Sequence, residues 1–74
     1  LLFTTPKAGN VNFKVYDVIG RRVFAEQLII SEAGKHHYVW KGVGNSGGQL
    51  PIGIYYFELE FGGAKLVQRA VMLK

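Results

Sequence analysis

The stretch VNFKVYDVIGR, residues 11–21, decides the fold class of this chain. Its first half alternates apolar and polar side chains, which places Val11, Phe13 and Val15 on one face of an expected strand. Asp17 and Gly20 then predict a tight hairpin turn, because an aspartate carboxylate bonds nearby amides and glycine adopts the left-handed conformation. The stretch therefore predicts a half-buried strand that turns directly into an antiparallel partner.

Five further segments outside this stretch have the composition of strands. A loop at 42–48 separates two of them, since four of its seven residues are glycine. Six strands with turn signals every ~8–12 residues are typical of a small antiparallel β-sandwich. The five segments are residues 1–5, 22–30, 35–40, 52–61 and 65–74.

The last of these segments allows two interpretations. Leu66, Ala70 and Leu73 fall at helical spacing, but ten residues are short for an unsupported helix. A two-residue hairpin turn at Gly62-Gly63 is the alternative that we adopt, because it sets opposite charges face to face and keeps two leucines together inside. The predicted pairs are Phe61 with Ala64, Glu60 with Lys65, Leu59 with Leu66, and Tyr56 with Arg69.

Length and composition limit the class of protein. With 74 residues and 49% hydrophobic side chains, the chain is expected to fold as one small module, residues 1–74, and to be a segment of a longer protein. No apolar run approaches the ~20 residues of a membrane span, and no signal peptide is recognisable. The net charge of +4 comes from basic residues spread evenly along the chain, which favours solvated faces over a nucleic-acid site.

The sequence offers little for catalysis or metal binding. Adjacent His36 and His37 point to opposite faces of a strand, so they cannot easily chelate one ion. Glu58 and Glu60 share a strand face and have basic partners across the sheet, as solvated ladder residues do. The glycine-rich loop 42–48 lacks the Gly-Lys-Ser/Thr ending of a phosphate loop. We therefore predict no enzymatic activity, no cofactor and no metal.

Four aromatic residues leave a second binding hypothesis open. Exposed aromatic rings could form a platform for stacking sugars, whereas core and cross-strand packing is the more ordinary role of such residues in a sandwich. We favour the packing role. The residues are Tyr38, Trp40, Tyr55 and Tyr56.

The order of motifs along the chain resembles the type A C-terminal sorting domains of the type IX secretion system. The opening, 6–21, is similar to the start of these domains, and the stretches 33–36 and 40–42 are similar to their middle strand. Residues 50–56, LPIGIYY, resemble the family's glycine-isoleucine-tyrosine motif, and the ending VMLK resembles its terminal motif. The immunoglobulin-like module of the flagellar hook-capping family is a close relative with a similar pattern.

The resemblance implies an all-β, immunoglobulin-like β-sandwich of about six to seven strands. It also implies a non-catalytic C-terminal signal that carries an exported cargo from the periplasm through an outer-membrane translocon. The expected partners are an outer-membrane shuttle protein, a surface sortase and the cargo domain, in a Gram-negative bacterium that secretes the cargo or displays it on the cell surface. By motif position, the expected recognition residues are Asp17, Gly20, Arg21, Gly53, Tyr55, Gly63, Arg69 and Lys74.

A function of another class stays open at this point. The same sandwich could be an accessory module of a secreted enzyme, with a structural role or with its aromatic residues binding carbohydrate.

Overall fold

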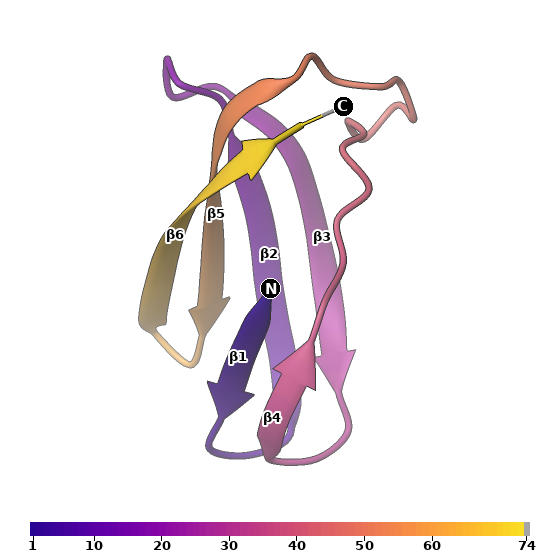
Figure 1. Ribbon diagram of the computed structural model, residues 1–74. Coiled ribbons are helices and arrows are strands. Elements are labelled where there is room, and N and C mark those ends of the chain that lie inside the picture. The colour runs from indigo at the N-terminus through magenta and orange to yellow at the C-terminus, as the bar shows by residue number, and fades with distance from the viewer. Residues whose placement is uncertain (74) are drawn as a thin grey trace.

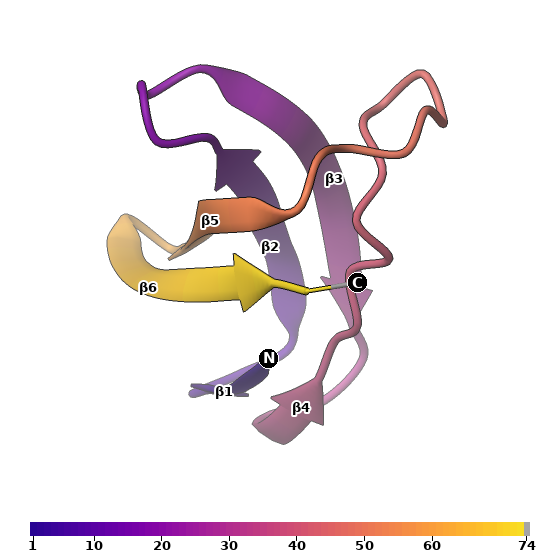
Figure 2. The same ribbon diagram turned by 45° about the horizontal axis from the view of Figure 1, so that its top comes forward.

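A computed structural model describes residues 1–73 of the chain, and this part forms six strands in two antiparallel sheets (Figure 1). The larger sheet has the strand order β3-β2-β5-β6, and the smaller sheet pairs β1 with β4. Figure 2 shows the smaller sheet lying across one face of the larger one. The predicted small antiparallel sandwich is therefore confirmed. The strands are β1 (Leu2–Thr5), β2 (Gly9–Tyr16), β3 (Arg22–Ile30), β4 (Gly34–His37), β5 (Gly53–Phe61) and β6 (Ala64–Met72).

Strand β2 supplies the centre of the core. Val11, Phe13 and Val15 are 1%, 0% and 0% exposed, which confirms the face predicted from their alternation. Phe3 of β1 closes this core from the smaller sheet, and Leu59 of β5 lies beside it in the larger sheet. The period-two pattern of one strand thus fixes which face of the larger sheet the smaller sheet covers.

The β5–β6 hairpin has the predicted register. All four expected pairs are present around a turn at Gly62-Gly63, so the helical interpretation of the last segment is excluded for residues 64–72. The expected burial of Leu66 is wrong, however: it pairs with Leu59 but stays 49% exposed. The smaller sheet has only two strands and does not reach across to Leu66, whereas Met72 near the end of the same strand packs against the core.

The strand expected at 35–40 is shorter than predicted: β4 ends at His37. Its only partner, β1, begins at Leu2, and the last backbone bonds of this ladder join Leu1 and Tyr38, both at 2.9 Å. Between His37 and β5 the described residues form no further strand and make only an isolated bridge between Val43 and Gln49. The chain crosses over the larger sheet as an irregular segment towards β5 (Figure 1).

The aromatic residues of this crossing segment pack inwards. The Trp40 ring lies 5.4 Å from the Tyr55 ring and 5.7 Å from the Phe57 ring, measured between centroids, and its indole N–H donates to the Val43 carbonyl. Tyr38 packs 4.6 Å from Phe13. The rings of Tyr38, Trp40 and Tyr55 thus pack as the packing hypothesis predicted, whereas Tyr56 on the other face of β5 is 38% exposed. Carbohydrate binding stays a prediction.

Within the described residues, no helix is long and apolar enough to span a membrane.

Candidate recognition site

The turn between β2 and β3 is organised by one carboxylate. Asp17 Oδ1 accepts hydrogen bonds from the backbone amides of Ile19 and Arg21 at 3.1 and 2.9 Å, and Oδ2 accepts one from the Arg21 guanidinium at 2.9 Å. Gly20 completes the turn with a φ of 85°, and its backbone amide donates a hydrogen bond to the Asp17 carbonyl. The predicted capping of the turn by Asp17 and the predicted left-handed Gly20 are both confirmed.

These bonds set the ionisation of Asp17. Desolvation alone would raise the pKa of the carboxyl, but the bonds from the Arg21 amide, the Arg21 side chain and the Ile19 amide together outweigh it. The pKa of Asp17 therefore lies below its ordinary value, and the carboxylate holds the turn in its charged form throughout the neutral range.

The acid sensitivity of this turn is a testable consequence. Because the folded-state pKa of Asp17 lies below its unfolded value, the charged group stabilises the fold above the unfolded pKa, and this contribution is lost as pH falls through the folded pKa. We expect the melting temperature of the wild type to exceed that of Asp17→Asn at neutral pH. The gap should shrink below about pH 4. A gap that stays constant in thermal melts from about pH 7 to about pH 2 would contradict this role.

Gly20 tests the same turn through its backbone. An added Cβ at Gly20 would meet no atom within 4 Å, so the cost of a side chain there comes from the positive φ alone. We expect Gly20→Val to lower the free energy of unfolding by more than about 1 kcal/mol in urea titrations. Gly48→Val is the matched control, because Gly48 also faces open space but has no positive φ. Equal stability of the two variants would contradict the assignment.

A second segment lies beside this turn. The Tyr55 hydroxyl donates a hydrogen bond to the Pro51 carbonyl at 2.6 Å, which joins β5 to the segment just before it. The tyrosine corner of immunoglobulin sandwiches makes a similar bond. Between this segment and the Asp17 turn lies a shallow hollow of about 500 Å³, lined by Asp17, Arg21 and Tyr55 among others. Two stretches far apart in the sequence, 17–21 and 51–55, thus form one surface, which we call the turn end.

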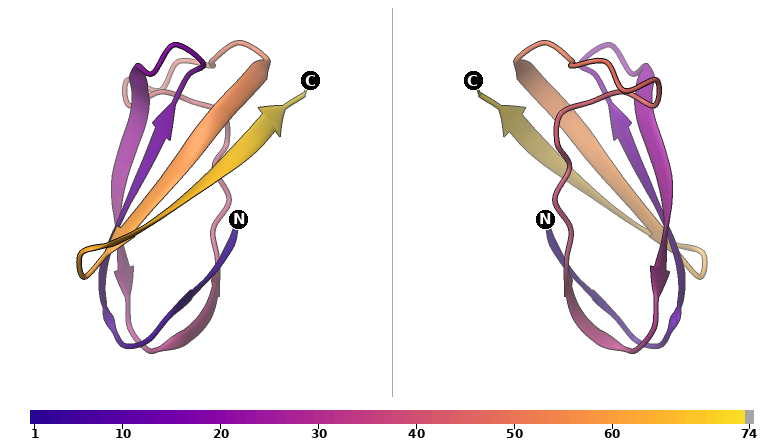
Figure 3. Two further views of the ribbon diagram at one scale, coloured as in Figure 1. Left: turned by 90° about the vertical axis from the view of Figure 1, so that its left-hand side faces the viewer. Right: turned by 90° about the vertical axis from the view of Figure 1, so that its right-hand side faces the viewer.

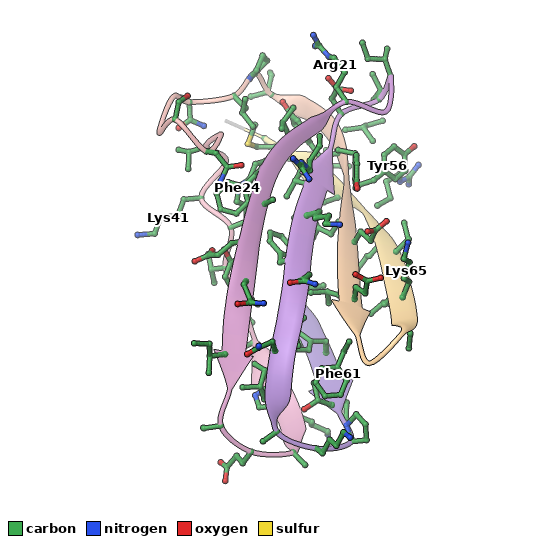
Figure 4. The ribbon with its side chains drawn as sticks, turned by 180° about the vertical axis from the view of Figure 1, so that it is seen from behind. Arg21, Phe24, Lys41, Tyr56, Phe61 and Lys65 are labelled. Atoms are coloured by element: carbon green, nitrogen blue, oxygen red, sulfur yellow. The ribbon has the colours of Figure 1, made fainter. Side chains whose placement is uncertain are left out.

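The turn end exposes several large apolar side chains. Val18 and Ile19 at the tip of the turn are 64% and 71% exposed, and Ile52 across the hollow is 62% exposed. Arg21 lies at the same end of the molecule, with most of its side chain in solvent (Figure 4). The Asp17 carboxylate accepts hydrogen bonds from the backbone of this turn, which defines the conformation in which Val18 and Ile19 are exposed.

The predicted recognition residues are divided among separate parts of the molecule. Five lie at the turn end, whereas Gly63 lies in the hairpin at the opposite end of β5 and β6 (Figure 1). Arg69 is exposed on β6 opposite Tyr56, and Lys74 lies outside the described residues. Their role in recognition stays a prediction. The five at the turn end are Asp17, Gly20, Arg21, Gly53 and Tyr55.

The exposed apolar tip was not among the predicted site residues. Its signal in the sequence was available, because Val18 and Ile19 occupy turn positions where Asn, Asp, Gly and Ser are usual. Apolar residues at such positions gain nothing from the fold.

The ionisable side chains outside the turn end make contacts within the two sheets. No group of three or more His, Asp or Glu side chains within residues 1–73 is placed to hold a metal ion. His36 contacts the Thr5 hydroxyl at 3.2 Å, and Glu58 lies 4.0 Å from Lys14 on the neighbouring strand. These are the contacts of ordinary sheet residues, and they leave the turn end as the candidate site.

The motifs of the turn end lie within a known family pattern. The model of the FlgD Ig-like domain matches residues 2–64, which include both the Asp17 turn and the Tyr55 segment. The chain belongs to the FlgD Ig-like domain family. No curated protein and no solved structure matches it. The FlgD Ig-like match ends at the start of β6, so that strand and Arg69 lie beyond the part that the family pattern describes.

Proposed function

We propose that this FlgD Ig-like module is a non-catalytic C-terminal sorting domain, which directs an attached cargo across the outer membrane by the type IX secretion system. The observation that carries the proposal is the turn end. Motif residues from two distant stretches line one hollow there, beside an exposed apolar tip whose turn Asp17 closes by hydrogen bonds. Exposed apolar patches on small soluble domains commonly mark interaction sites.

We assign the residues of the turn end to two proposed roles on the basis of their contacts. Asp17, Gly20 and Tyr55 build the frame, because their groups are used in bonds or backbone geometry within the module. Val18, Ile19 and the exposed face of Arg21 are free to meet a receptor. Burial of two large aliphatic side chains contributes roughly 1.5–3 kcal/mol each to an interface. The proposed receptor is the outer-membrane shuttle protein of the translocon.

The proposal places the module in the periplasm in transit. Afterwards the cargo is released or held at the surface of a Gram-negative cell, where a sortase is the second proposed partner.

A fusion experiment tests the proposed function. Residues 1–74 are joined to the C-terminus of a reporter that carries a periplasmic leader, in a host with the type IX translocon. We expect the reporter in the medium or at the cell surface, and we expect it to stay in the periplasm of a matched host that lacks the translocon. Periplasmic retention in both hosts, with a folded module, would contradict the proposal.

The family match favours a second candidate of another class. A structural Ig-like module related to the flagellar hook-capping family would need the fold of residues 2–64 but no export address. Such a module would leave the reporter in the periplasm of both hosts. The fusion experiment therefore separates the two candidates directly.

A further inference from the structure

The two sheets of the sandwich differ in width, and this leaves the inner face of β6 without cover at Leu66, whereas Met72 further along the strand packs against the core. Four strands face only two, and the smaller sheet covers the inner side of β2 and β3 (Figure 2). Leu66 lies on the inner face of β6 beside Leu59, yet half of its side chain is in solvent. An inward apolar residue without cover indicates room for another strand in the smaller sheet.

The backbone of β1 is open on the side where that strand would lie. Leu1 and Tyr38 exchange both of their backbone hydrogen bonds, so the hydrogen-bonded pairs of this antiparallel ladder are Leu1, Phe3 and Thr5 with their partners on β4. The N–H and C=O groups of the alternate residues, Leu2 and Thr4, therefore point away from β4. In the part of the chain that the structure describes, β1 pairs with no other strand.

A groove runs between this open edge and the β5–β6 hairpin. Its volume is about 370 Å³, and Figure 3 shows how the twist of the larger sheet carries β6 away from the smaller sheet. Phe3, Leu59, Phe61 and Leu66 give the groove an apolar lining. A strand in it would meet both free backbone groups on one side and apolar side chains beneath.

The charges at the groove are of one sign. Lys7 and Lys65 are the charged residues that line it, and no acidic residue within residues 1–73 does so, although Glu60 lies directly opposite Lys65 in the β5–β6 ladder. A second copy of the chain would bring its own net charge of +4 towards these lysines and would be repelled. An acidic segment of another protein is attracted by the same field.

We propose that this groove binds an extended acidic peptide segment of a partner protein, which adds as a third strand to the open edge of β1. The backbone of the segment bonds Leu2 and Thr4, as in other cases of β-strand addition. Its apolar side chains alternate inwards over Leu66, and its carboxylates lie near Lys7 and Lys65. The proposal stands independently of the sorting function, because it uses other residues at the other end of the hairpin.

A designed peptide tests the groove. The probe is a short capped peptide in which valine occupies every second position and glutamate and threonine the others. A control peptide has the same composition with the valines adjacent. We expect the alternating peptide to slow hydrogen exchange at the amides of Leu2 and Thr4 and to shift the NMR signals of Leu66, and the control peptide to bind more weakly.

Charge reversal tests the lysines. In the double variant Lys7→Glu/Lys65→Glu, the dissociation constant of the alternating peptide should rise about tenfold. The matched double variant Arg22→Glu/Lys41→Glu makes the same change in net charge at exposed residues outside the groove, and should change it less than about twofold. If both double variants weakened peptide binding equally, the weakening would be an effect of net charge alone, and the proposal would be overturned.

Three further results would overturn it as well. One is protection of the outer edge of β6, at Val67 and Val71, in place of Leu2 and Thr4. Another is equal affinity for the control peptide, which would exclude strand addition. The third is a dimer in sedimentation equilibrium whose interface protects Leu2 and Thr4, because the groove would then serve a second copy of the chain.

Discussion

Replacement of Phe13 by alanine is expected to lower the free energy of unfolding by about 3–5 kcal/mol. The Phe13 side chain is fully buried, and its ring lies 4.6 Å from Tyr38 and 5.2 Å from Phe57 between centroids. It thus joins the larger sheet to the crossing segment that follows β4. Domains of this kind are stable by only about 5–15 kcal/mol, so the loss would leave the variant close to unfolded at room temperature. Urea unfolding followed by circular dichroism measures the change.

Two variants control this prediction. Phe13→Leu keeps most of the apolar volume and should cost clearly less than the alanine variant, because a smaller cavity remains. Ile29→Ala removes an apolar side chain that is 82% exposed on β3, and should change stability by less than about 0.5 kcal/mol. A Phe13→Ala variant that unfolds at nearly the wild-type urea midpoint would show that the core is centred elsewhere.

The sequence predicts those parts of the fold that depend on near neighbours. The face of β2 follows from alternation alone, since its three inward residues are all apolar. The register of β5 and β6 follows from a two-residue glycine turn, which leaves little freedom to the strands on either side. The Asp17 turn is equally local, because all of its bonds lie within five residues.

The parts that the sequence does not predict depend on distant pairing. The end of β4 is set by where β1 begins, and nothing in the stretch 35–40 carries that information. The exposure of Leu66 likewise depends on the width of the opposite sheet. The pairing of Leu66 with Leu59 follows from the local hairpin and is predicted by the sequence. Whether another strand covers Leu66 depends on the width of the opposite sheet.

The candidate site shows the same division. Asp17 and Tyr55 were each recognised by motif, but their meeting at the turn end depends on the pairing of β2 with β5, in which Tyr16 lies opposite Tyr56. This pairing aligns the end of one strand with the start of the other, although some forty residues separate them in the chain. The exposed side chains of Val18 and Ile19 become part of a larger apolar surface only because that second segment, with Ile52, lies beside them.

Replacement of Arg69 by alanine is expected to reduce export of the fused reporter about thirtyfold or more, while the isolated variant melts near the wild-type temperature. Arg69 is exposed on β6 opposite Tyr56, so its removal takes little buried surface from the fold. An exposed charge contributes about 0–1 kcal/mol to stability. A charged group desolvated against a receptor can contribute roughly 2–5 kcal/mol to binding, and this difference separates an address from a structural role.

The matched control for Arg69 is Arg22→Ala, which removes another exposed arginine, from β3. Both variants lose the same charge and the same side chain, so a general effect of charge or expression would lower their export alike. Only recognition of β6 predicts that Arg69→Ala fails while Arg22→Ala is exported normally. Normal export of both variants would exclude Arg69 from the address and leave the turn end as its proposed site. Failure of Arg69→Ala together with a lowered melting temperature would instead assign the residue to the fold, against the small loss of buried surface expected from its position.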